Sequence, residues 1–100
     1  MPYSVVWSPK ALRSYSQVLE YLQENWTEKE KLNFINRTEL VLFNISQNPS
    51  LYPYLATHIA YKAIITKQVS LLYHLKGTSV ELLMFWDNRQ NPDKLNKFIE

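Results

Sequence analysis

The feature that most constrains the fold is a change of hydrophobic period near the middle of the chain. In residues 8–47, apolar side chains recur every three or four positions, which is the period of an amphipathic α-helix. From residue 59 onward they follow the period of two that is typical of β-strands. A chain of 100 residues has room for one core, so both halves must share it. The sequence therefore predicts a single α+β domain over residues 1–100.

Two helices are expected in the first half, and each has its own start signal. Ser8 and Pro9 predict an N-cap followed by a proline in the first helical position, and this helix runs to about residue 25. Thr27 followed by Glu30 has the spacing of a capping box and begins the second helix, which ends near residues 48–49. Because so few residues separate the helices, they must form an antiparallel hairpin.

Four β-strands are expected around this hairpin, over residues 3–7, 59–66, 69–76 and 80–87. The last three are joined by residues 67–68 and 77–79, lengths that suit tight turns, so they form an antiparallel meander. The expected order is β-α-α-β-β-β, with the helical hairpin packed on one face of a four-stranded, mainly antiparallel sheet. Residues 91–98 are expected to form a last short helix or a loose tail.

The alternation along the three long strands separates two faces of the sheet. The uncharged face is expected to pack under the helices, and it holds Ile59, Tyr61, Ala63, Ile65, Val69, Leu71, Tyr73, Leu75, Val80, Leu82, Met84 and Trp86. The opposite face mixes charged groups with four large apolar side chains, Ile64, Leu72, Leu83 and Phe85. This mixture predicts a surface for a partner. The alternative is that the tail folds back over it through Leu95, Phe98 and Ile99.

Composition excludes several classes of function. The chain has no cysteine, so it has no disulfide scaffold and no cysteine nucleophile. Two histidines and no glycine-rich loop give no support for a metal or a cofactor, and none is expected. The net charge of +2 is small for a dedicated nucleic-acid binder. No signal peptide and no apolar run long enough to span a membrane are present, so we expect a cytoplasmic protein.

Four segments, in this order of elements, resemble the RelE/ParE toxins, the toxin halves of bacterial type II toxin–antitoxin modules. They are Trp7-Ser8-Pro9-Lys10-Ala11, Asn48-Pro49, Leu71-Leu72-Tyr73 and Asp87-Asn88-Arg89-Gln90-Asn91-Pro92. The resemblance spans residues 3–92 and rests on their collective spacing. It implies a growth-inhibiting toxin of a plasmid-stabilisation type of system, which a cognate antitoxin neutralises. The antitoxin is expected to contact Ile64, Leu72, Leu83 and Phe85.

The resemblance leaves two mechanisms open, and specific residues bear on the choice. Toxins of the RelE branch cut mRNA on the ribosome, with an arginine in the middle strand and two lysines in the strand before it. Here Ser70 stands at the arginine position, and Lys62 and Ile64 stand at the two lysine positions. The remaining catalytic candidates under the RelE hypothesis are Lys62, His74 and Arg89.

The long helical hairpin is more typical of the ParE branch, whose members bind DNA gyrase and have no nuclease chemistry. The long hairpin and the absence of an arginine in the middle strand together favour a ParE-like toxin in which Lys62 and Arg89 contact the target. A RelE-like, ribosome-dependent mRNA endoribonuclease is the alternative. A second alternative is an inactive relative that only binds an antitoxin.

Overall fold

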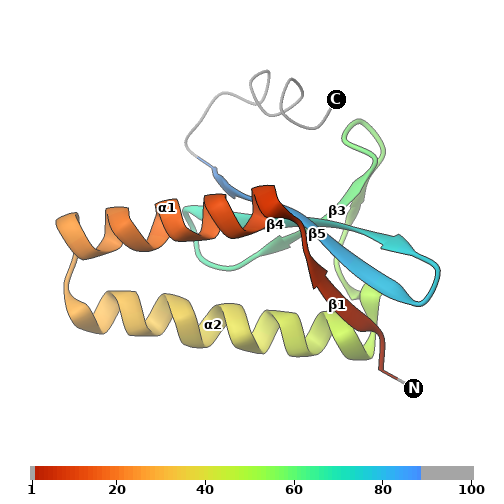
Figure 1. The fold of residues 1–100 in the computed structure, drawn as a ribbon, viewed down its shortest axis with the longest axis horizontal. Coiled ribbons are helices and arrows are strands. Elements are labelled where there is room, and N and C mark those ends of the chain that lie inside the picture. The colour runs from red at the N-terminus through yellow and green to blue at the C-terminus, as the bar shows by residue number, and fades with distance from the viewer. Residues whose placement is uncertain (1, 89–100) are drawn as a thin grey trace.

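The computed structural model describes residues 2–88 (Figure 1). Two helices and a small 3-10 helix accompany five strands. In chain order the elements are β1 (Ser4–Trp7), α1 (Pro9–Asn25), α2 (Glu28–Gln47), η1 (Pro49–Leu51), β2 (Tyr54–Leu55), β3 (Ala60–Ile64), β4 (Val69–Lys76) and β5 (Ser79–Asp87). Among residues 2–88 no helix is long and apolar enough to cross a membrane.

The five strands form one sheet in the order β1-β5-β4-β3-β2. Only β1 and β5 run parallel, and the other neighbours are antiparallel. The expected α+β architecture, with the helical hairpin on one face of a mainly antiparallel sheet, is confirmed. The sheet has one strand more than expected, because two residues after Pro53 pair with the start of β3. So short a segment carries no alternation from which a strand can be predicted.

Both predicted helix starts are present. The Ser8 hydroxyl accepts a hydrogen bond from the Ala11 N–H at 3.0 Å. At the second start, Thr27 Oγ1 accepts from the Glu30 N–H at 3.2 Å, while the Glu30 carboxylate accepts from the Thr27 N–H at 3.5 Å. These bonds satisfy backbone donors that a helix leaves without partners in its first turn. Because the cap of α2 forms immediately after α1 ends, only Trp26 and Thr27 connect the two helices.

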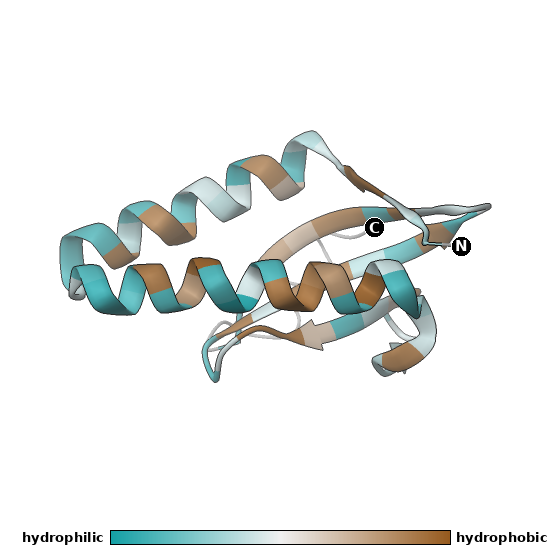
Figure 2. Cartoon of the chain, turned by 90° about the horizontal axis from the view of Figure 1, so that it is seen from below, coloured by the Kyte–Doolittle hydropathy of each residue, from teal (hydrophilic) through white to brown (hydrophobic). Residues whose placement is uncertain are grey.

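The core lies between the helices and the sheet, and we call this side of the sheet the helix face. The fully buried side chains of the hairpin repeat at helical spacing, and Figure 2 shows hydrophobic and hydrophilic segments alternating along α1 and α2. Tyr15 is central to the packing, with ring centroids 5.3 Å from Trp7, 5.7 Å from Phe34 and 4.9 Å from Phe85. Burying aromatic rings supplies much of the hydrophobic stabilisation of so small a core.

A β-bulge in β5 corrects the predicted faces of the sheet. Tyr73 pairs with Leu82, but Leu72 pairs with Met84, so Leu83 is an extra residue in β5. One extra residue reverses the alternation that follows it. Phe85 therefore lies on the helix face and is 3% exposed, so its predicted place on the opposite, charged face of the sheet is wrong. For the same reason Met84 and Trp86, which were expected under the helices, lie on the other side of the sheet.

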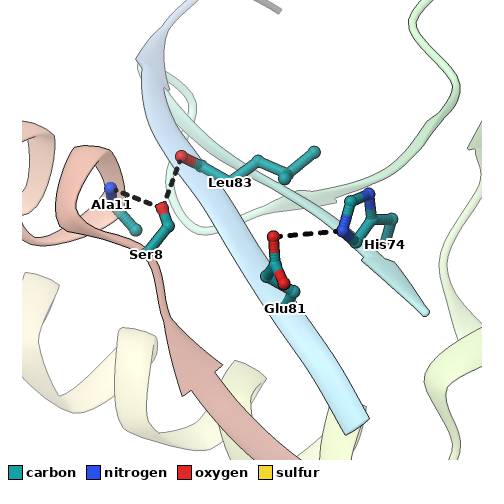
Figure 3. Close-up of polar contacts among 5 residues, drawn as sticks. All are labelled: Ser8, Ala11, His74, Glu81 and Leu83. Carbon is teal, nitrogen blue, oxygen red and sulfur yellow. Dashed lines mark hydrogen bonds and ion pairs between the residues drawn. The ribbon is translucent and has the colours of Figure 1, made fainter. Parts of the chain in front are cut away.

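Two serines of the first helix fix the bulge in place. The Ser8 hydroxyl donates a hydrogen bond to the Leu83 carbonyl at 3.1 Å (Figure 3). Six residues further along the chain, within α1, the Ser14 hydroxyl accepts from the Phe85 N–H at 2.9 Å. Both contacts occur where β1 has ended, so α1 satisfies backbone groups that no neighbouring strand reaches.

The turn between β2 and β3 also departs from the predicted pattern. Ile59 was expected to begin a strand and to pack under the helices. It has a positive φ of 51° and is 71% exposed, so it belongs to the turn. Left-handed backbone is unfavourable for a β-branched residue. By contrast, the positive φ of 63° at Gly77 lies in the predicted β4–β5 turn, where glycine adopts it at little cost.

Candidate functional site

The candidates predicted from the sequence lie mainly on the side of the sheet opposite the helices, which we call the far face. Strand alternation and the bulge place on it Ala60, Lys62, Ile64, Ser70, Leu72, His74, Lys76, Glu81, Met84 and Trp86. The far face has two parts with different chemistry. One part, near the β4–β5 turn, is charged and partly exposed. The other, toward the opposite ends of these strands, is mostly apolar and buried except for Ile64.

The charged part centres on a His74–Glu81 pair. The register of β4 and β5 sets these residues directly opposite each other. His74 Nε2 lies 3.3 Å from a carboxylate oxygen of Glu81, and the two side chains are 38% and 34% exposed (Figure 3). Because Glu81 contacts Nε2, the contact orients the imidazole and leaves Nδ1 as the ring nitrogen that can face a substrate. Sequence reasoning missed this pair, because the predicted turn of residues 77–79 is one residue longer than the actual Gly77–Thr78 turn, which sets Glu81 opposite His74.

Lys62 adds a positive charge beside this pair. It lies opposite Leu72 on the neighbouring strand, so His74 is its diagonal neighbour on the same face. Diagonal neighbours in antiparallel sheets are about 7–8 Å apart, within reach of a lysine side chain. Among residues 2–88, no carboxylate lies within ion-pair distance of the Lys62 ammonium group. The charged part thus combines a group that can exchange a proton with a cation that can stabilise negative charge.

The buried part contains Ser70, the position at which the RelE branch carries an arginine. The Ser70 side chain is fully buried, and its hydroxyl donates to the Asn88 carboxamide oxygen at 2.8 Å. Asn88 in turn donates to the Lys67 carbonyl at 3.2 Å. Beside Ser70, Leu72 is 0% exposed and packs with Met84 and Trp86. Within the described residues this position therefore has no counterpart of the arginine that the resemblance implies.

The four residues predicted to contact an antitoxin are not brought together in one exposed surface. Ile64 is 59% exposed, and Leu83 is half-buried. Leu72 and Phe85 are buried, on opposite faces of the sheet, so neither presents the apolar surface that was expected. Arg89 lies outside the described residues, as do the expected helix over 91–98 and the tail residues Leu95, Phe98 and Ile99.

Tyr73, from the middle-strand segment that carries part of the resemblance, is a structural residue. Its hydroxyl donates to the Pro49 carbonyl at 2.6 Å, which ties η1 to the sheet. Burial, together with the neighbouring Tyr52 and Tyr61, raises the pKa of Tyr73 above the usual tyrosine value. Its ring stacks on Tyr61 at a centroid distance of 5.2 Å. Its contacts are thus those of the core, on the helix face.

No group of three or more histidine, aspartate or glutamate side chains within residues 2–88 is arranged to hold a metal ion. The charged part of the far face holds His74, Glu81 and Lys62 and, at the end of β4, the exposed Lys76. Of these we carry His74, Glu81 and Lys62 forward as the candidate functional site.

Comparison with protein-family models and with curated proteins finds no match. Among solved structures, the chain is similar to the YoeB dimer from Staphylococcus aureus, with a TM-score of 0.61 and 16% sequence identity. The similarity spans 90% of this chain and 100% of the YoeB chain. At this level of identity the likeness concerns the path of the backbone. The chain therefore has the fold of YoeB, with its two helices on a five-stranded sheet.

Proposed function

We propose that this chain is the toxin of a type II toxin–antitoxin module and a RelE-like, ribosome-dependent mRNA endoribonuclease. The observation that carries the proposal is the fold similarity over the whole length of YoeB, a toxin of the RelE superfamily. The four sequence segments that resemble RelE/ParE toxins agree with the toxin part of the proposal and do not distinguish its two mechanisms. A protein that cuts mRNA on ribosomes acts in the cytoplasm.

The charged part of the far face supplies the chemistry. In metal-independent RNA cleavage, a base takes the proton of the ribose 2′-hydroxyl, the 2′-oxygen bonds to phosphorus, and the bond from phosphorus to the 5′-oxygen breaks, with the 5′-oxygen taking its proton from water. We assign removal of the 2′-hydroxyl proton to His74, because one of its ring nitrogens contacts Glu81 and the other remains for the substrate. We assign Lys62 to the negative charge that grows on the phosphate oxygens. Glu81 acts through His74 and is a positioning residue.

The gyrase-binding, ParE-like function that the sequence favoured finds no support in the fold comparison. It stays a prediction, and its consequences differ from those of the proposed nuclease. A gyrase-binding toxin stops DNA replication and leaves mRNA intact. An inactive relative leaves both replication and translation unchanged. One induction experiment therefore separates the three hypotheses.

The test induces the chain without an antitoxin and follows amino-acid incorporation and thymidine incorporation in parallel. We expect translation to fall first and mRNA to be cut only when ribosomes are present. His74→Ala and Lys62→Ala are each expected to lower the cleavage rate by about 10²-fold or more, the usual contribution of such groups. Arrested replication with intact mRNA would overturn the proposal.

Two control substitutions outside the candidate site test whether the loss of cleavage activity is specific to His74 and Lys62. His58→Ala removes the other histidine, which lies in the turn before β3, and Lys29→Ala removes an exposed lysine of α2. Both are expected to keep the cleavage rate of the natural chain. If these variants lose as much activity as His74→Ala and Lys62→Ala, general destabilisation explains the loss and the assigned roles are wrong.

The proposed module also requires an antitoxin. A protein encoded beside this chain is expected to co-purify with it and to restore growth. Ile64 is the most exposed of the predicted contacts, so Ile64→Asp is expected to weaken the complex, whereas Leu32→Asp, at a similarly exposed leucine on α2, is not. Equal weakening by both substitutions would count against the predicted contact.

A further inference from the structure

A pocket of about 360 Å³ lies on the helix face, on the opposite side of the sheet from the candidate site. It is formed by the second half of α1, the first half of α2, the turn before β4 and the end of β5. Figure 1 shows α1 and α2 continuing past the sheet toward the turn that joins them. The pocket occupies the place where the hairpin leaves the sheet, so neither layer fills it.

The lining of this pocket has an unusual composition. Four aromatic residues line it, of which Phe34 and Phe85 are buried in the core and Tyr21 and Trp26 are partly exposed, together with the carboxylates of Glu30 and Asp87. Among the described residues that line it, none is a lysine, an arginine or a histidine. Aromatic faces and carboxylates both attract cations, the first through the ring quadrupole and the second through charge. The pocket therefore matches a positively charged group with an apolar body.

Glu30 can receive such a group without giving up its structural role. Its Oε1 atom accepts from the Thr27 N–H and from the Thr27 hydroxyl, at 3.5 and 3.2 Å. An ionised carboxylate has about four acceptor positions on two oxygens, so Oε2 keeps its acceptor capacity. Asp87 already interacts with another group, so Glu30 is the carboxylate that would make the direct charge contact.

We infer that this pocket binds an arginine side chain of a partner protein. The guanidinium group is planar, stacks on aromatic rings and pairs with carboxylates, so it uses both features of the lining. Val18, Leu22 and Val69 line the pocket as well and can contact the aliphatic stem. The volume is at the small end of ligand sites, which suits one side chain better than a cofactor. Arginine anchors in such pockets commonly dominate interface energies.

This inference goes beyond the proposed nuclease and does not depend on it. The test uses the purified full-length chain and the tripeptide N-acetyl-Leu-Arg-Leu-amide, followed through the indole N–H signal of Trp26. The signals of Trp7 and Trp86 serve as internal references, because neither residue is among those that line the pocket. The matched peptide carries citrulline, which has nearly the shape of arginine and no charge. We expect the citrulline peptide to bind about tenfold more weakly.

Two substitutions in the first turn of α2 separate the pocket from general electrostatics. Glu30→Gln removes the charge in the pocket, while glutamine still serves as a capping-box partner. It is expected to weaken binding of the arginine peptide about tenfold. Glu28→Gln removes the same charge from the same helix end, outside the pocket, and is expected to change the affinity less than twofold.

Three results would each refute the inference. The first is an unchanged Trp26 signal at saturating peptide. The second is equal affinity for the arginine and citrulline peptides, which shows that charge is not recognised. The third is binding of free arginine amide as tight as that of the tripeptide, which identifies a site for small molecules. None of these measurements involves ribosomes or RNA, so they leave the proposed nuclease function untouched.

Discussion

Replacing Ser14 by alanine tests how the bulge in β5 is held. The Ser14 hydroxyl donates to the Lys10 carbonyl at 2.8 Å and accepts from the Phe85 N–H at 2.9 Å. Ser14 is 9% exposed and Phe85 is 3% exposed, so the Phe85 N–H loses its protein acceptor in a largely buried place. A buried N–H without a partner costs about 1–3 kcal/mol. Alanine regains a few tenths of a kcal/mol through its higher helix propensity, so we expect Ser14→Ala to lower the free energy of unfolding by about 1–2 kcal/mol.

Urea denaturation measures this change directly. The transition midpoint is expected to fall while the slope of the free energy against urea stays constant, since the surface exposed on unfolding hardly changes. Ser16→Ala, two residues further along α1 and exposed, is the control. It is expected to stay within about 0.5 kcal/mol of the natural chain. If the two variants unfold at the same urea concentration, the Phe85 N–H has another partner and the reasoning is wrong.

Two further stability predictions concern backbone strain and a buried hydroxyl. Ile59→Asn is expected to raise the melting temperature, because asparagine tolerates the positive φ of 51° and relieves about 1 kcal/mol. Ile64→Asn, in a strand and similarly exposed, is not expected to raise it. Tyr73→Phe removes the hydrogen bond to Pro49 and is expected to cost about 1 kcal/mol at neutral pH. Because the pKa of Tyr73 is raised in the folded state, its stabilisation is complete below pH 10.0 and is lost as the pH rises further. The unfolding free energy of Tyr73→Phe should therefore decline less steeply above pH 10.

The elements set by local chemistry were predictable from the sequence. Ser8 and Thr27 begin the helices because their side chains satisfy nearby N–H groups, and such contacts depend on only three or four neighbouring residues. The β4–β5 turn follows in the same way from the only glycine in the chain. The two-residue strand after Pro53 was missed, since its pairing depends on a distant segment and not on its own pattern.

The candidate site was predictable only in part. Strand alternation placed Lys62 and His74 on the same face, and the structure agrees. It failed for Phe85, because the extra residue at Leu83 is held by serines of a helix some 70 positions away in the chain, as the Ser14–Phe85 separation of 71 shows. Periodicity within a strand contains no sign of such a contact. The sequence already has Ser70 where the RelE branch carries an arginine, and what it did not predict is that this side chain is fully buried.

The parallel pairing of β1 with β5 has a consequence for synthesis of the chain. Residues 4–7 pair with residues 79–82, and Ser8 reaches Leu83 across 75 positions. β1 is synthesised first, but the strand it pairs with, β5, is synthesised last. Pairings between segments so far apart in the chain form late in folding. A nascent chain that stops before Ser79 holds both helices and lacks β5, the strand that joins β1 to β4 in the sheet. The complete sheet can thus form only in chains translated at least to the end of β5, so a message cut upstream of that point yields β1 without its partner strand.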